Sequence, residues 1–251
     1  MKRLINLVIL SLAVVLTLAN AASADIYMKQ KLHTDATQMM GVAQPAKDVI
    51  AQIWITEKGF RSDDPAHSTI MLGKEQKMII LDHAAKTYME QPINMNDMMA
   101  RMGKDKSPEE QAAMKQMMQN MMKMDASVQE TKDQKTINNW KCRKYILKIN
   151  SAMGPITNEV WATEDLKVDK KVYEQLAARM LSSMPGLQSS MEGMKKEMEK
   201  IKGVQVLTKS TFTMMNQTHK ATTELLEFKE GTAPKGIFDI PAGYKKQTMQ
   251  P

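Results

Sequence analysis

The spacing of the apolar residues changes several times along this 251-residue chain, and these changes limit the folds that it can adopt. Residues 25–90 carry short β-rich apolar runs separated by turn residues, which is typical of an antiparallel meander. Residues 93–124 then place methionines three and four positions apart, as on one side of a helix. Strand spacing returns in 140–163 and, after a second helical region at 169–201, again towards the C-terminus. This order predicts an α+β fold rather than alternating strand and helix units.

The two helical regions are expected to supply about four helices. In the first, Ser107-Pro108-Glu109-Glu110 has the sequence of a capping box with proline at the first helical position. In the second, the apolar residues from Leu187 to Ile201 step by 4-3-4-3, which suits the packing of one helix on another. The methionines that line the first region are Met95, Met98, Met99, Met102, Met114, Met117, Met118, Met121 and Met122. We therefore expect a curved antiparallel sheet covered by these helices, including a Met-rich insertion.

The N-terminus has the three parts of a secretory signal peptide. Two basic residues follow the first methionine, residues 4–18 are almost wholly apolar, and Ala22 and Ala24 are the small residues that signal peptidase requires. The apolar run is shorter than the roughly 20 residues of a membrane-spanning helix. We therefore expect cleavage after Ala24, a periplasmic or secreted protein, and one mature domain of residues 25–251.

Cys142 is the one cysteine of the chain, so an internal disulfide is excluded and stability depends on the hydrophobic core. We interpret Cys142 as a buried thiol, with an intermolecular disulfide or a reactive thiol as alternatives. The net charge of the full chain is +7, and it falls by the two basic residues of the signal peptide to +5. No basic run alternates with aromatic residues, which argues against a nucleic-acid partner. The modest positive charge suits peripheral contact with an anionic membrane.

Motifs of catalysis and metal binding are missing from the sequence. The four histidines are scattered and form none of the short spacings of a zinc site. The sequence contains no nucleophile elbow, no phosphate-binding glycine loop and no dinucleotide fingerprint. We therefore expect neither an enzyme nor a bound cofactor.

The abundance of methionine, 26 residues in all, has three interpretations. Methionine at helical spacing packs a helix against a sheet, because the flexible thioether fills irregular gaps. The same residues form an adaptable apolar cover for a lipid, an acyl chain or a hydrophobic segment of a partner. Pairs such as Met95/Met98, Met114/Met117 and Met118/Met121 place two soft sulfur atoms on one side of a helix, which suits Cu(I) or Ag(I). The sequence leaves these interpretations open.

Several short motifs carry a resemblance to a known family. They are Ile53-Trp54-Ile55 with Arg61, Ile79-Ile80-Leu81-Asp82, Ile137 with Trp140-Lys141-Cys142-Arg143-Lys144-Tyr145, Val160-Trp161-Ala162-Thr163-Glu164-Asp165, and Phe238-Asp239-Ile240-Pro241-Ala242-Gly243-Tyr244. With them the chain resembles a family of exported bacterial proteins known only as a domain of unknown function. This family is similar in fold to the periplasmic lipoprotein carriers and receptors, whose sheet is a strongly curved half-barrel with helices over its open face. The resemblance implies an apolar concavity that holds acyl chains or another hydrophobic ligand.

The leading functional hypothesis is therefore a non-catalytic binding protein of the periplasm or cell envelope. Its apolar cavity would hold a lipid, an acylated protein or another hydrophobic ligand, with the nine methionines above as the ligand-contacting or lid face. One alternative is a Met-rich protein that binds Cu(I) or Ag(I). Another is a structural envelope protein that binds a partner through its helices. The sequence does not set the oligomeric state.

Overall fold

The structure is a computed structural model of the chain, and most of the expected mature domain can be described. The described residues are 25–39, 42–93, 97, 107–121, 124–152, 154–168, 188–214 and 217–247. The predicted signal peptide, including Ala22 and Ala24, lies outside them.

Twelve strands form one large sheet in the order β14-β8-β7-β6-β5-β4-β1-β13-β12-β11-β10-β9. Neighbouring strands pair antiparallel, except that β14 pairs parallel with β8. The strands of this sheet are β1 (Asp25–Thr34), β4 (Lys47–Ile55), β5 (Gly59–Asp63), β6 (His67–Leu72), β7 (Lys77–Asp82), β8 (Thr87–Pro92), β9 (Met124–Ile137), β10 (Trp140–Ser151), β11 (Gly154–Thr163), β12 (Val204–Met214), β13 (Gln217–Gly231) and β14 (Lys245–Lys246). A separate hairpin consists of β2 (Thr37–Met39) and β3 (Val42–Gln44).

The prediction of an α+β fold with about four helices is wrong. The described part of the chain is mostly sheet and contains two short helices, α3 (Pro108–Met121) and α5 (Gln188–Met198). Residues 126–136 are predicted from the sequence only to be polar and extended, whereas in the structure they belong to β9 and join the sheet. Because β9 lies at the edge and pairs only with β10, it needs no regular apolar alternation. The other two predicted helices fall almost entirely outside the described residues.

Local sequence signals are confirmed at two element ends. At the start of α3, the amide of Glu110 donates to Oγ of Ser107 at 3.2 Å, and the amide of Ser107 donates to Oε2 of Glu110 at 2.8 Å. This is the reciprocal pairing of a capping box. The sequence Asn138-Asn139 predicts a tight hairpin turn, because asparagine tolerates a positive φ, and in the structure Asn138, between β9 and β10, has a φ of 53°.

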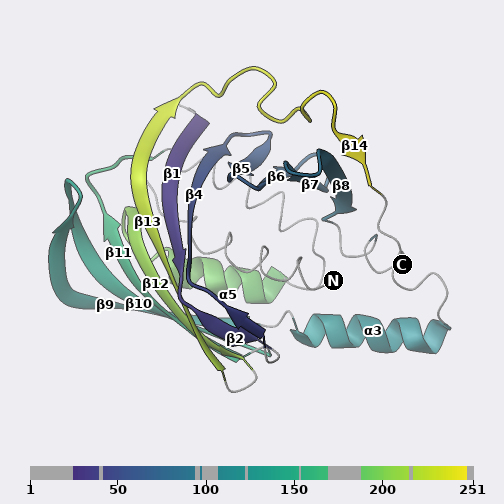
Figure 1. Ribbon diagram of the computed structural model, residues 1–251. Coiled ribbons are helices and arrows are strands. Elements are labelled where there is room, and N and C mark those ends of the chain that lie inside the picture. The colour runs from purple at the N-terminus through teal and green to yellow at the C-terminus, as the bar shows by residue number, and fades with distance from the viewer. Residues whose placement is uncertain are drawn as a thin grey trace.

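The long strands bend into an arc, and α5 lies inside it (Figure 1). Pairing shifts at Lys29/Gln30, Arg143/Tyr145 and Trp161/Ala162 interrupt the register, and such bulges increase local bending. α5 also protects the sheet edge, because the amide of Val128 on β9 donates to Oε2 of Glu197 at 2.8 Å. This contact occupies a donor that an added strand would otherwise use.

The two halves of the sheet differ in how they bury their inner face. Around β10 and β11 a cluster of buried side chains lies inside the curve, where Met198 and Ile201 contact Tyr145, Leu147 and Val160. The core therefore forms between the inner face of the long strands and α5.

On β6 and β7, by contrast, the outer face is buried. Ile70, Ile79 and Leu81 pack against Phe238 and other residues of segment 232–244, which we call the strap. The strap runs along the outer side of the sheet from β13 to β14 (Figure 1). The inner face of β5 to β8 is thus free to have another role.

Candidate functional site

The inner face of β5 to β8 carries apolar side chains that are only half-buried. Phe60 pairs with Met71, Met71 pairs with Met78, and Ile80 pairs with Met89. Directly paired residues of neighbouring strands lie on the same face of a sheet, so these five side chains form one surface. We call this surface, made of Phe60, Met71, Met78, Ile80 and Met89, the inner strip.

The inner strip is continuous with the core. Phe60 pairs with the fully buried Ile55 and packs against the same core cluster. Three of the five residues are methionines, whose unbranched thioethers can reshape around different apolar groups. Sequence analysis missed these residues because it examined methionines at helical spacing. The available signal was the unbroken apolar run from Met78 to Leu81, which supplies apolar residues to both faces of one strand.

Only some of the nine methionines that were predicted to form a ligand-contacting or lid face belong to the described residues. On α3, Met114 is half-buried and Met117 is 62% exposed. Met118 and Met121 belong to α3, but their side chains lie outside the description. The others, Met95, Met98, Met99, Met102 and Met122, lie outside the described residues. A ligand-contacting or lid face made of these methionines therefore stays a prediction.

A recess of about 430 Å³ lies near the turn between β9 and β10. Its lining is Gln134, Lys135, Thr136, Lys141, Cys142, Arg143, Ala162, Glu164, Asp165 and Lys202. Four basic and two acidic side chains make it polar, unlike the apolar cavity expected from the resemblance. Cys142 is 2% exposed, which confirms its interpretation as a buried thiol. Burial raises the pKa of this thiol to about 11, so it is not a nucleophile at neutral pH.

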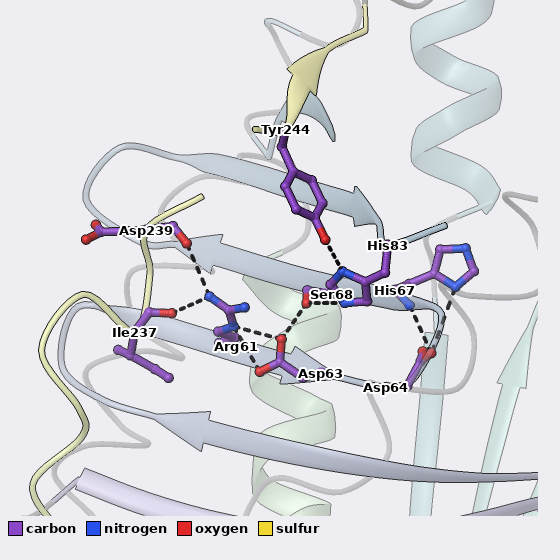
Figure 2. Close-up of polar contacts among 9 residues, drawn as sticks. All are labelled: Arg61, Asp63, Asp64, His67, Ser68, His83, Ile237, Asp239 and Tyr244. Carbon is purple, nitrogen blue, oxygen red and sulfur yellow. Dashed lines mark hydrogen bonds and ion pairs between the residues drawn. The ribbon is translucent and has the colours of Figure 1, made fainter. Parts of the chain in front are cut away.

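Polar side chains on the outer face form a continuous hydrogen-bonded chain (Figure 2). The Tyr244 hydroxyl lies 2.6 Å from Nδ1 of His83, whose Nε2 lies 3.0 Å from Oγ of Ser68. Ser68 donates to Asp63, and Nε of Arg61 donates to both oxygens of Asp63 at 2.8 and 2.9 Å. We call Arg61, Asp63, Ser68, His83 and Tyr244 the outer clasp.

The outer clasp holds the strap on the sheet. Nη1 of Arg61 donates to the carbonyl oxygens of Ile237 at 2.6 Å and Asp239 at 3.3 Å (Figure 2). The packing of Tyr244 against the outer core adds an apolar contact. Thus the motif at 238–244 is joined to the strand that carries Arg61, although the two are far apart in the sequence.

The outer clasp contains the residue types of a hydrolytic triad in a different order. In a serine hydrolase the histidine lies between the serine and the acid, so that it can remove the serine proton. Here Ser68 lies between Asp63 and His83 and is fully buried. One set of donors satisfies the chain: Tyr244 donates to Nδ1 of His83, Nε2–H donates to Ser68, and Ser68 donates to Asp63. This geometry suits a structural connection.

No group of three or more His, Cys, Asp or Glu side chains suited to a metal ion occurs among the described residues. None of the described helices has the length and apolar character needed to cross a membrane.

Comparison with known proteins gives one family and a distant structural likeness. A crystal structure from Vibrio parahaemolyticus, provisionally named as an outer membrane lipoprotein-sorting protein domain, is 7% identical, with 86% of this chain and 89% of that chain covered and a TM-score of 0.31. No curated protein matches the sequence. The family model DUF4412, a domain of unknown function, matches residues 40–244, which include Arg61 and Tyr244 of the outer clasp. Because that match spans most of the chain, this protein belongs to the DUF4412 family.

Proposed function

We propose that this protein is a non-catalytic binding protein of the bacterial cell envelope that holds a hydrophobic ligand against the inner face of its sheet. The ligand class is a lipid, an acylated protein or a similar amphiphile. The observation that carries the proposal is the inner strip, an apolar surface that is half-buried and continuous with the core.

The character of the inner strip supports binding over plain core packing. The outer-face residues Ile70, Ile79 and Leu81 of the same strands are at most 3% exposed, because the strap covers them. The inner strip is more accessible, and its methionines provide a surface that adapts to chains of different shape. Met117 on α3 is a further apolar side chain that is accessible to solvent.

Export and the lack of catalysis belong to the same proposal. The basic start, the apolar run and the Ala22 and Ala24 pattern support secretion, and the envelope is where acyl chains need carriers. The buried position of Ser68 and the order of the outer clasp support a non-enzymatic role.

Binding of Cu(I) or Ag(I) is the second candidate. The exposure of Met117, three residues after the half-buried Met114, supports it, because soft cations need accessible sulfur. Anaerobic titration with Cu(I) against a competing chelator tests this candidate. An affinity no tighter than micromolar would exclude it.

The primary test measures binding of a neutral apolar dye, N-phenyl-1-naphthylamine, to the delipidated protein. We expect the double variant Met71→Gln, Met78→Gln to bind the dye at least about tenfold more weakly, since each substitution replaces an apolar contact by a polar group. Leu226→Gln, at a 39% exposed position in the bulge of β13, is the matched control and should bind normally.

A second measurement identifies the natural ligand. Delipidated protein is mixed with envelope extract, purified again and examined by native mass spectrometry. We expect a lipid or a lipidated peptide to be recovered with the wild type and less with the double variant. Equal dye binding by all three proteins, or no recovered ligand from several extracts, would contradict the proposed function.

A further inference from the structure

Two buried side chains beneath α5 carry hydrogen-bond donors that have no partner among the described residues. Tyr145 on β10 is fully buried, and Gln205 on β12 is 4% exposed. The hydroxyl of Tyr145 and Nε2 of Gln205 are the two unpaired atoms. Buried side-chain donors nearly always have an acceptor, so two donors without one in the same region require an explanation.

Both side chains lie on the inner face, on either side of β11. Tyr145 pairs with Val160, and Gln205 pairs with Ala162. Val160 and Ala162 both pack in the core cluster that includes Ile201, next to α5. The main chains of β10 and β12 are two strand spacings apart, about 10 Å, a separation that a tyrosine and a glutamine can span together.

The neighbours of each side chain leave its donor available. Oγ1 of Thr208 donates to Oε1 of Gln205 at 3.3 Å, which orients the amide with Nε2 unpaired. The backbone of Lys202 contacts the Tyr145 hydroxyl and lowers the pKa of this group, as an N–H donor to the phenol oxygen does, while burial raises the pKa more strongly. In both residues the oxygen is contacted and the hydrogen has no acceptor.

The polar recess adjoins the two donors. Ala162 and Lys202 line it, and these are the residues that flank Gln205 and Tyr145 respectively. The distance across the sheet from β12 to β5 is four strand spacings, about 19 Å. One long acyl chain can therefore reach both the donors and the inner strip.

We propose that Tyr145 and Gln205 bind the carbonyl oxygen of an acyl ester or amide whose chain extends along the inner face towards the inner strip. This inference rests on the proposed function and names the ligand class more narrowly. Both donors are neutral, and a neutral carbonyl suits them better than a phosphate or a carboxylate, because burying an anion beside neutral groups alone is unfavourable. Apolar sites commonly use a few such polar groups to orient a ligand.

The test compares two phospholipids that differ only at the proposed contact. Dihexanoyl phosphatidylcholine has ester carbonyls, and its dihexyl ether counterpart has none. Both are titrated below their micellar concentrations as competitors of N-phenyl-1-naphthylamine. We expect the ester to bind the wild type about fivefold more tightly than the ether, the effect of roughly one neutral hydrogen bond.

Variants assign the preference to the two residues. Tyr145→Phe and Gln205→Met should each reduce the ester preference, and the double variant should bind ester and ether equally. Tyr244→Phe makes the same chemical change in the outer clasp and should keep the full preference. Urea unfolding of each variant confirms that it is folded. Gln205→Met also removes the acceptor of the Thr208 hydroxyl, so this variant should be somewhat less stable, whereas Tyr145→Phe removes a donor that has no acceptor among the described residues.

The outcomes separate the two proposals. Equal binding of ester and ether by the wild type, or a preference unchanged in the double variant, would overturn the carbonyl contact while leaving the hydrophobic site in place. Failure of both lipids to displace the dye, together with a normal dye affinity in the Met71→Gln, Met78→Gln variant, would overturn the proposed function as well. A triacylated lipopeptide, titrated in parallel, distinguishes a protein-borne acyl group from a membrane lipid, and weaker binding of either by the Tyr145→Phe, Gln205→Met variant supports the carbonyl contact.

Discussion

The outer clasp and the inner donor pair, Tyr145 and Gln205, are both sets of polar side chains on one sheet, yet they differ in how completely they are hydrogen-bonded. In the outer clasp, each side chain from Tyr244 to Arg61 has a hydrogen-bond partner, and Arg61 also donates to carbonyl oxygens of the strap. On the inner face, Tyr145 and Gln205 keep donors that have no acceptor among the described residues. A completed network stabilises a fold, whereas an incomplete one destabilises it unless a ligand supplies the partner. The contrast is consistent with a structural role for the outer face and with the binding role that we propose for the inner face.

The largest expected effect comes from breaking the outer clasp at Arg61. Arg61→Ala should lower the free energy of unfolding by about 2 kcal/mol or more, because the carboxylate of Asp63 loses its charged partner and the strap loses two hydrogen bonds. The strap should also become sensitive to limited proteolysis. Urea unfolding measures the first effect, and mass spectrometry of the fragments measures the second.

The control for Arg61 is an arginine whose ion pair lies in solvent. Arg143 contacts Glu130 at 3.3 Å, with the two side chains 48% and 42% exposed. Arg143→Ala should change the free energy of unfolding by less than about 0.5 kcal/mol. Equal losses in Arg61→Ala and Arg143→Ala would show that the outer clasp adds nothing beyond surface charge.

A smaller effect separates two tyrosines that undergo the same substitution. Tyr244→Phe should lower the free energy of unfolding by about 1 kcal/mol, since His83 loses a hydrogen-bond donor. Tyr145→Phe should lower it by less, because the hydroxyl removed has no acceptor among the described residues and only the contact with the Lys202 backbone is lost. Thermal and urea unfolding measure both. A loss in Tyr145→Phe as large as that in Tyr244→Phe would remove the distinction between the two faces.

The smallest effect is a pH dependence at the end of the strap. Lys246 on β14 donates to Glu90 on β8, and this bond, followed by the one from Lys77, holds the pKa of Glu90 below its ordinary value of 4.5. A carboxylate with a lowered native pKa stabilises the fold above its unfolded pKa, and this contribution is lost as the pH falls through the native pKa. Stability should therefore decline below about pH 4.5, with a few tenths of a kcal/mol due to Glu90.

The variant Glu90→Gln tests this contribution. It should be less stable than the wild type at pH 7 and should lose less stability between pH 5 and pH 3. Glu75→Gln, on the exposed turn between β6 and β7, makes the same charge change away from the strap and is the control. Identical pH profiles for the wild type and Glu90→Gln would contradict the assignment.

Sequence analysis identified elements whose signals are local. The capping box at Ser107, the positive φ at Asn138 and the short strands of the meander follow from backbone preferences of a few neighbouring residues. Membership in a family of unknown function was also recognised from short motifs. The predicted number of helices was wrong, because the described residues are mostly sheet and contain two helices. β9 was not predicted as a strand, because its polar sequence has no regular apolar alternation and it is extended through its pairing with β10.

The inner strip and the donor pair could not be predicted from local sequence signals. Met78 and Ile79 are adjacent in the sequence, and only the position of the strap decides which of the two faces becomes core. In the same way, Tyr145 and Gln205 are 60 positions apart, and it is the order β10-β11-β12 that brings them to one place.

The sequence by itself therefore determined the signal-peptide pattern, the lack of an internal disulfide and the local strand, turn and cap positions, because each depends on a few adjacent residues or on composition. Only the tertiary structure decided that one twelve-stranded sheet uses its outer face for the strap and its inner face for an apolar surface with unpaired donors. The physical reason is that alternation places side chains on two faces but does not say what will cover either, whereas burial and hydrogen-bond pairing depend on contacts between distant segments.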